Sequence, residues 1–563
     1  MNSHSFSIRC RACQHQTPYT QPYTTCPNCG QSWLDAVYDL ETVRQQWPAS
    51  LAQYGASLWR YRDLLPVRNP RNIVSLGEGW TPLIQAHNLG LLLGHDHLFI
   101  KDERQGPTAS FKDRQATVAI SVMKEAGVKE CVVASTGNVA IAYSAFCARA
   151  GIKLWTFVTS SVPAEKMREV ALYGSEVIKV AGTYDQCKQV AMEFAHSKGI
   201  YLDKGIRAIS SKEAMKTLAF EVAEQLGAIR GGSDYTVPNP GNFPWQAPDW
   251  YLQSVSGGLG PVGVMKGFRE LKAMGLIDKI PKLALFQVAG CAPMVNAFQK
   301  GSPVPLDVDN PLTDITTLAT GRPGEAYQVL RELIREHGGT MEIVTDAEAF
   351  RALHVLAKMD GLSVEPATAV TFAGLFNLIH QGIIGKDETV VVNCSGHTFP
   401  VEKHIVGEHH TRDMVLDVED AAAATGREEG LVTALEELDP RVQRIAIIED
   451  NPDATRLIRR ILQAQGEFLI EEATNGLDGL NLIRRTRPNL VILDLMMPGL
   501  DGFGVVEAMK KDSTLQEIPI IVITAKTLTP GEKRWLDSQV DGLWEKGSFM
   551  DVDLLSHIRK KLP

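Results

Sequence analysis

The sequence predicts an α/β protein with two separate parallel-sheet regions and a short cysteine-bearing segment in front of them. From about residue 36 to residue 400, short β-rich runs alternate with amphipathic stretches of roughly 10–15 residues, the pattern of a parallel sheet covered by helices. The same alternation resumes on a smaller scale after residue 441. A chain of 563 residues is also too long for one hydrophobic core. We therefore expect a small N-terminal module (1–35), a large α/β domain (36–405), a linker (406–440) and a small doubly wound domain (441–563).

Charge and hydropathy argue against several classes of protein. The net charge of −9 is opposite to the basic excess of nucleic-acid-binding proteins, so no nucleic-acid partner is expected. No run approaches the roughly 18–20 apolar residues of a membrane span, and the N-terminal residues lack the features of a signal peptide. We expect a cytoplasmic protein without a membrane partner.

Four of the nine cysteines form two knuckles of equal spacing, Cys10-x2-Cys13 and Cys26-x2-Cys29. Each knuckle can present two thiolates from one tight turn, and four thiolates satisfy a tetrahedral Zn²⁺. Residues 1–35 are too few to form a core, so bound metal would supply their stability. Two disulfides and an iron site of rubredoxin type are the alternatives. The five remaining cysteines lie in apolar runs and are expected to be buried.

The large domain carries three polar turns, each directly after a predicted strand. Lys112 follows LFIKDE and opens a helix, a position in which partial desolvation can lower the pKa of an amine for imine formation. The turn 135–138 (Ser-Thr-Gly-Asn) opens the next helix and could bind a carboxylate. The turn 256–260 (Ser-Gly-Gly-Leu-Gly) precedes another helix and could approach a phosphate closely. A lone lysine at such a place is more often a solvated charge, but three such turns in this order favour one shared site.

These turns resemble the fold-type II pyridoxal-phosphate enzymes and, among them, the threonine synthase family. The resemblance covers about residues 10–400 and implies two parallel-sheet α/β subdomains behind a zinc ribbon. The motifs that carry it are the cysteine knuckles, GEGWTPL (77–83), KDERQGPTASFKDR (101–114), ASTGNVA (134–140), PDWYLQSVSGGLG (248–260), VEPATAV (364–370) and NCSGH (393–397).

The resemblance also implies roles for individual residues. Lys112 would bind pyridoxal 5′-phosphate covalently and later carry protons. Asn138 would contact the 3′ oxygen of the cofactor, and Ser395 its pyridine nitrogen, where a hydroxyl partner leaves that nitrogen largely unprotonated. Two further groups would bind anions. The substrate carboxylate would be held by Ser135, Thr136 and Gly137, and the cofactor phosphate by Ser256, Gly257, Gly258, Leu259 and Gly260.

The implied reaction converts O-phosphohomoserine and water to threonine and phosphate. Two departures from the family pattern leave the substrate open: the loop SGGLG (256–260), where relatives more often show GNAGN-like loops, and GTYDQC (182–187). Arg104, Arg114 and Lys166 could pair with a substrate phosphate or be surface charges. The alternatives are a threonine dehydratase-like enzyme, another pyridoxal-phosphate-dependent lyase or β-replacement enzyme, and a non-catalytic regulator of a two-component pathway.

Acidic residues mark the strand ends of the C-terminal domain. Glu449 and Asp450 follow RIAII, Asp494 follows VIL, Thr524 ends IPIIVIT, and Lys546 follows DGLWE. In a doubly wound sheet these positions meet at one edge. Three carboxylates there favour a Mg²⁺ ion, and the hydroxyl and lysine suit an incoming phosphoryl group. Any one of the carboxylates alone could be a helix cap.

This pattern, with DLMMPGLDG (494–502), resembles a response-regulator receiver domain. The resemblance implies a flavodoxin-like (βα)5 fold in which Asp494 is phosphorylated and Glu449, Asp450 and Asp494 bind Mg²⁺. Thr524 and Lys546 would be the switch residues, and a histidine kinase or phosphotransfer protein the partner. For the whole chain we expect a homodimeric lyase that acts on a small amino acid and is modulated by phosphorylation.

Overall fold

The computed structural model describes most of the chain. The described residues are 6–20, 23–135, 137–159, 162, 164–234, 236, 238, 244–397, 443–463, 468–524, 526 and 528–545. The predicted linker 406–440, Thr136 and Lys546 lie outside them. The chain divides into two compact units: the first contains 1–86, 97–355 and 363–400, and the second is formed mainly by 401–563. Among the described residues, no helix combines the length and the apolar character needed to cross a membrane.

The first unit begins with a small antiparallel sheet of order β2-β1-β3. Its strands are β1 (Ser7–Cys10), β2 (Gln16–Pro18) and β3 (Leu34–Val37), and they carry the cysteine knuckles on the adjoining turns. Helix α1 (Leu40–Gln53) follows, capped by Asp39, whose carboxylate accepts the Thr42 N–H at 3.1 Å. An aromatic group packs Phe6 on Tyr19 and Tyr38, with ring centroids 4.5 and 5.3 Å apart. This small module therefore buries a few aromatic rings but has no large hydrophobic core.

The larger sheet of the first unit has six strands in the order β12-β11-β10-β13-β5-β4. All neighbours are parallel except β4, which pairs antiparallel with β5. Strands β10 and β13 are buried throughout, as expected for a parallel sheet covered on both faces. The strands are β4 (Leu83–Gln85), β5 (Leu98–Asp102), β10 (Trp250–Ser254), β11 (Lys282–Val288), β12 (Gly339–Val344) and β13 (Val390–Cys394). The helices around this sheet are α8 (Thr217–Arg230), α9 (Leu259–Ala273), α10 (Pro293–Gln299), α11 (Glu325–His337), α12 (Asp346–Asp360) and α13 (Pro366–His380), whereas α2 (His87–Leu93) belongs to the second unit.

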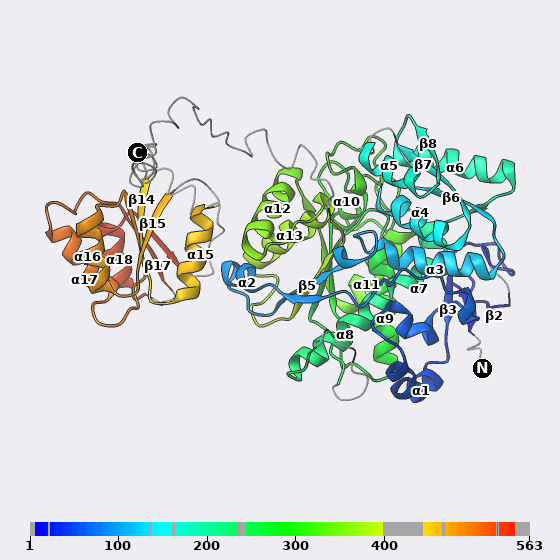
Figure 1. The fold of residues 1–563 in the computed structure, drawn as a ribbon, viewed down its shortest axis with the longest axis horizontal. Helices are drawn as coiled ribbons and strands as arrows, with labels where there is room; N and C mark the ends of the chain where they lie inside the picture. Colours follow the sequence, from blue (N-terminus) through cyan, green and yellow to red (C-terminus); the bar gives the residue numbers. More distant parts are fainter. Residues whose placement is uncertain are drawn as a thin grey trace, which may run out of the picture. The chain divides into compact units, whose positions relative to one another are not determined.

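A second sheet of the first unit has four parallel strands in the order β8-β7-β6-β9. Its strands are β6 (Glu130–Ala134), β7 (Lys153–Thr159), β8 (Glu176–Val180) and β9 (Tyr201–Leu202). The helices with it are α3 (Lys112–Glu125), α4 (Asn138–Ala150), α5 (Ala164–Leu172), α6 (Tyr184–Lys198) and α7 (Ile209–Met215). Helix α3 packs on α4 and α7, and α7 packs on α9, so helices link the two sheets (Figure 1). The prediction of two parallel-sheet α/β subdomains is confirmed.

The second unit contains one parallel sheet of order β15-β14-β16-β17-β18. This is the flavodoxin-like order, in which the strand order reverses between β14 and β16, and ligands bind at that point, beyond the carboxyl ends of the strands. The strands are β14 (Gln443–Ile448), β15 (Phe468–Ala473), β16 (Leu490–Leu493), β17 (Ile520–Thr524) and β18 (Gly542–Glu545). The helices are α15 (Pro452–Gln463), α16 (Gly476–Thr486), α17 (Gly502–Lys511) and α18 (Pro530–Gln539). The predicted doubly wound domain is confirmed.

Candidate active site and metal clusters

A cavity of roughly 610 Å³ lies in the first unit, where strands of both sheets end. The three predicted turns all reach it, although they are far apart in the sequence. Its lining includes Lys112, Ser135, Gly137, Asn138, Ser256, Gly257, Gly258, Leu259, Gly260 and Ser395. The cavity is within the size range of small-molecule sites. The structure therefore brings together every predicted cofactor and substrate residue of this domain that it describes.

Lys112 is the first residue of α3 and faces this cavity. Burial lowers the pKa of Lys112 to about 8, and the Glu365 carboxylate opposes that effect. The Lys112 ammonium lies 4.0 Å from the centre of the Phe111 ring. Within the described residues, the Lys112 amine forms no hydrogen bond or ion pair. A lysine with a lowered pKa and no fixed partner is suited to act as a nucleophile and a base.

The turn after β6 presents the start of α4 to the cavity. The Ser135 Oγ accepts hydrogen bonds from the N–H groups of Gly137 (3.1 Å) and Ala140 (3.2 Å), which fixes this turn. Ser135 thus takes two N–H groups at the start of α4, and among the described residues those of Asn138 and Val139 have no partner and are available to an anion. The Lys166 ammonium lies 3.6 Å from the position that a Cβ would take at Gly137. This geometry suits a carboxylate ligand.

The turn after β10 has room for a phosphate because of its glycines. Gly258 has φ +82°, and a Cβ there would lie 2.9 Å from the Leu330 Cδ1. A Cβ at Gly260 would lie 2.4 Å from the Gln253 Nε2, whereas one at Gly257 would meet no atom within 4 Å. Helix α9 has 15 residues and no side-chain cap, so its first N–H groups are available to an anion. These features fit the phosphate group of pyridoxal phosphate.

Glu365, which the sequence analysis did not single out, joins Asn138 and Ser395. The Asn138 Nδ2 donates to the Glu365 Oε2 at 2.7 Å, and the Ser395 Oγ donates to the Glu365 Oε1 at 3.1 Å. Glu365 is buried and lines the cavity. Its position in the motif VEPATAV was part of the resemblance, but nothing in the residue spacing marks it as a cavity residue.

Two of the three cations considered for a substrate phosphate are engaged elsewhere. Arg114 is buried and pairs with Glu103 at 2.7 Å and with Glu221 at 2.6 Å. Arg104 pairs with Asp102 through two nitrogens, at 2.7 and 2.8 Å. Neither guanidinium is a surface charge, and neither arginine is among the residues that line the cavity. They stabilise the loop and helix that carry Lys112.

The four N-terminal cysteines form one cluster. The Cys10 and Cys29 sulfurs are 3.6 Å apart, and the Cys13 and Cys26 sulfurs 3.7 Å apart. All four sulfurs lie within 4.8 Å of one another. Zn–S bonds of about 2.3 Å in a tetrahedron place sulfurs roughly 3.8 Å apart, so the cluster fits Zn²⁺. The nine cysteines are all free thiols, and the five outside the cluster are buried.

The module that carries this cluster also contributes to the cavity. Ser32, three residues after Cys29, is part of the cavity lining. The Lys212 ammonium donates to the Leu34 carbonyl at 2.7 Å and pairs with Asp35 at 2.9 Å, and its side chain has no exposed surface. The cysteine module is therefore packed on the same helix layer that encloses the site.

The predicted acidic cluster of the second unit forms at the expected edge of the sheet. Carboxylate oxygens of Glu449, Asp450 and Asp494 lie within 4.8 Å of one another. Asp494 follows β16 directly and accepts the Leu495 N–H at 2.7 Å. Thr524 ends β17 and is buried. Oxygen donors at this spacing fit a hard divalent cation.

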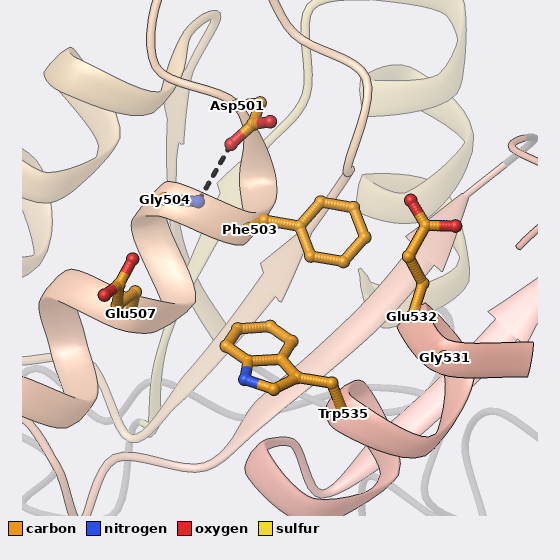
Figure 2. A pocket seen from close by; sticks show the side chains of 7 residues that line it. All are labelled: Asp501, Phe503, Gly504, Glu507, Gly531, Glu532 and Trp535. Atoms are coloured by element: carbon orange, nitrogen blue, oxygen red, sulfur yellow. Dashed lines mark hydrogen bonds between the residues drawn. The ribbon is translucent and has the colours of Figure 1, made fainter. Parts of the chain in front are cut away.

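A second hollow, of roughly 480 Å³, lies between α17 and α18. Figure 2 shows Phe503 and Trp535 extending toward one another from the two helices, with ring centroids 5.8 Å apart. Asp501 caps α17 by accepting the Gly504 N–H at 2.8 Å, and Glu532 pairs with Lys526 at 2.7 Å. Asp501 and Glu532 thus cap or pair at the helix ends, and the lining contains no serine, threonine, cysteine, histidine or lysine side chain.

The chain matches two family models. Residues 74–396 match the model described as pyridoxal-phosphate dependent enzyme, and residues 445–559 match the response regulator receiver domain. A threonine synthase of Methanocaldococcus jannaschii is 35% identical over 391 residues, which are 69% of this chain and 91% of that protein. A threonine synthase of Methanosarcina acetivorans is 34% identical over 393 residues, or 70% and 91% of the two chains. One from Synechocystis is 32% identical over 351 residues, or 61% and 85%.

Proposed function

Because this chain belongs to the threonine synthase family of pyridoxal-phosphate-dependent enzymes and carries a receiver domain, we propose that it converts O-phosphohomoserine and water to threonine and inorganic phosphate. One observation carries the proposal. A desolvated lysine, the start of α4 after β6 and a glycine turn after β10 line the same cavity. This is the set of groups needed to hold an amino acid and a phosphorylated aldehyde cofactor together.

Different residues of the cavity would bind different parts of the cofactor. Residues 256–260 would bind its phosphate, Lys112 would bind its aldehyde carbon, and Asn138 and Ser395 would contact its ring. When bound, pyridoxal phosphate withdraws electrons from the α carbon of an amino acid and so acidifies the Cα and Cβ protons.

The remaining chemistry belongs to residues of this chain. Ser135, Thr136 and Gly137 would hold the substrate carboxylate at the start of α4. The Lys112 amine, with its pKa near 8, would take the protons from Cα and Cβ and return protons at Cα and Cγ. Phosphate leaves with the electrons of its bond to Cγ, and water supplies the hydroxyl at Cβ.

Phosphate release tests this proposal. Purified protein loaded with cofactor should release inorganic phosphate from O-phosphohomoserine, with threonine formed in equal amount. Lys112→Ala should lose the activity, whereas Lys124→Ala, an exposed lysine on the same helix, should keep it. Brisk ammonia release from threonine without phosphate release from O-phosphohomoserine would instead identify a dehydratase.

We also propose that phosphorylation of Asp494 modulates this enzyme. Three clustered carboxylates that can bind Mg²⁺ and the buried Thr524 at the next strand end support phosphoryl transfer to this position. A histidine kinase or phosphotransfer protein would be the donor. Turnover should change when the full-length protein is treated with beryllofluoride and Mg²⁺. Equal turnover with and without the adduct would refute the regulation but leave the enzymatic proposal untouched.

A further inference from the structure

Glu365 occupies an unusual place at the start of α13. It is the N-cap residue of that helix, yet its side chain forms no cap hydrogen bond. Only 4% of the residue is exposed, and it lines the cavity. A buried carboxylate is unfavourable unless it is hydrogen-bonded or paired. The hydrogen-bond partners of Glu365 therefore explain how a carboxyl group can lie there.

Those partners belong to both sheets of the first unit. Asn138 opens α4, directly after β6 of the four-stranded sheet, and donates to the Glu365 Oε2 at 2.7 Å. Ser395 follows β13 of the six-stranded sheet and donates to the Glu365 Oε1 at 3.1 Å. One carboxylate thus ties together the two subdomains at the cavity.

The same bonds fix the direction of each polar group. A hydroxyl has one proton, and the proton of Ser395 is directed at Glu365. Thr368, whose Oγ1 lies 2.8 Å from the Ser395 Oγ, accepts the Gly396 N–H at 3.1 Å and can donate its own proton to Ser395. Ser395 is then left with an acceptor lone pair for a ligand, and Asn138 with one N–H and its carbonyl oxygen.

We propose that Glu365 is a positioning residue, whose carboxylate holds the Asn138 amide and the Ser395 hydroxyl in the orientations that receive the cofactor ring. The inference rests on the proposed cofactor site but not on the identity of the substrate.

Two variants of Glu365 separate the effect of its charge from the effect of its side-chain length. Glu365→Gln removes the charge and keeps the size, and because Glu365 opposes the lowering of the Lys112 pKa, that pKa should fall further, by about 1. Glu365→Asp keeps the charge but shortens the side chain, so the Lys112 pKa should change less while both hydrogen bonds are lost. Thr368→Val is the control for the labelling of Lys112 only, since it alters a neighbour of Ser395 without a change of charge.

Two readouts make the test independent of catalysis. In cofactor-free protein, the pH dependence of Lys112 labelling by an amine reagent, followed by peptide mass spectrometry, should show roughly fivefold faster labelling at pH 7 in Glu365→Gln and no change in Thr368→Val. The dissociation constant of pyridoxal phosphate should rise about tenfold in both Glu365 variants, as expected for a lost pair of positioning bonds. The other charged side chains of the cavity are the same in every variant: Asp203, Lys188, Lys204, Arg207 and Arg322.

A labelling profile and a cofactor affinity within twofold of the wild type in Glu365→Gln would overturn the proposal. If Glu365→Gln does not fold, Glu365→Asp still decides, because an unchanged cofactor affinity in that variant contradicts a positioning role. Absence of phosphate release would refute the proposed reaction and would leave both of these readouts as they are.

Discussion

The burial of Lys112 predicts the pH range in which cofactor-free protein can capture pyridoxal phosphate. Only the neutral amine attacks an aldehyde, and burial lowers the pKa of Lys112 from 10.5 to about 8. At pH 7 the neutral fraction is then about 10%, against roughly 0.03% for a lysine of ordinary pKa, a difference of about 300-fold. The second-order rate of capture should therefore rise about tenfold per pH unit below pH 8 and level off above it.

Stopped-flow absorbance of the cofactor, recorded between pH 6 and pH 10, measures this rate. Lys112→Ala supplies the blank, and Lys124→Ala controls for capture by surface lysines. A rate that still climbs tenfold per unit above pH 9 would refute the reasoning, since it would mean that the amine is fully hydrated. The sign for stability follows as well: because the folded-state pKa is depressed, the contribution of Lys112 to the stability of cofactor-free protein is present above pH 10.5 and is lost as the pH falls through about 8.

Three further predictions concern the metal clusters and the glycine turn. One zinc ion per chain should be released when a thiol reagent is added, and its removal should lower the unfolding temperature; a zinc content below one tenth per chain would contradict the assignment. Gly258→Ala should weaken pyridoxal phosphate binding about tenfold, because a Cβ is strained at φ +82° and would lie 2.9 Å from the Leu330 Cδ1, whereas Gly257→Ala should bind normally. Asp494→Asn should abolish the phosphorylated species that acetyl phosphate produces on a phosphate-affinity gel, and a persisting species would place the phosphoryl group elsewhere.

Much of the fold could be predicted from the sequence because its signals are local. A short apolar run followed by an amphipathic stretch predicts a βα unit wherever it occurs, and β6 with α4 or β14 with α15 matches its run closely. The order of the strands in each sheet, in contrast, is not encoded by local signals. Pairing β13 beside β5 joins segments almost 300 residues apart, and no local pattern encodes that choice.

The residues of the candidate site also fall into two groups, those that the local sequence predicts and those whose roles depend on tertiary contacts. Turns such as 256–260 carry their function in their own residue types, so their chemistry could be inferred before their place was known. Glu365 and Arg114 carry nothing comparable: a glutamate before a helix predicts a cap, and an arginine in an opening turn predicts a solvated charge. Their roles are set by partners such as Asn138 and Glu221 that only tertiary structure supplies.

The cysteine module combines a local sequence signal with tertiary contacts. Its knuckles are a local signal, but its effect on the site depends on packing, since Ser32 lines the cavity and the ammonium of buried Lys212 ends on the Leu34 carbonyl and Asp35. Such a short module has too little core to hold that geometry without its metal. Metal binding would therefore stabilise more than the module, because it would fix part of the cavity wall and the partners of the buried Lys212 ammonium on α7. If the cysteine module had no role at the site, neither the place of Ser32 in the cavity lining nor the contact of Lys212 with Leu34 and Asp35 would be needed.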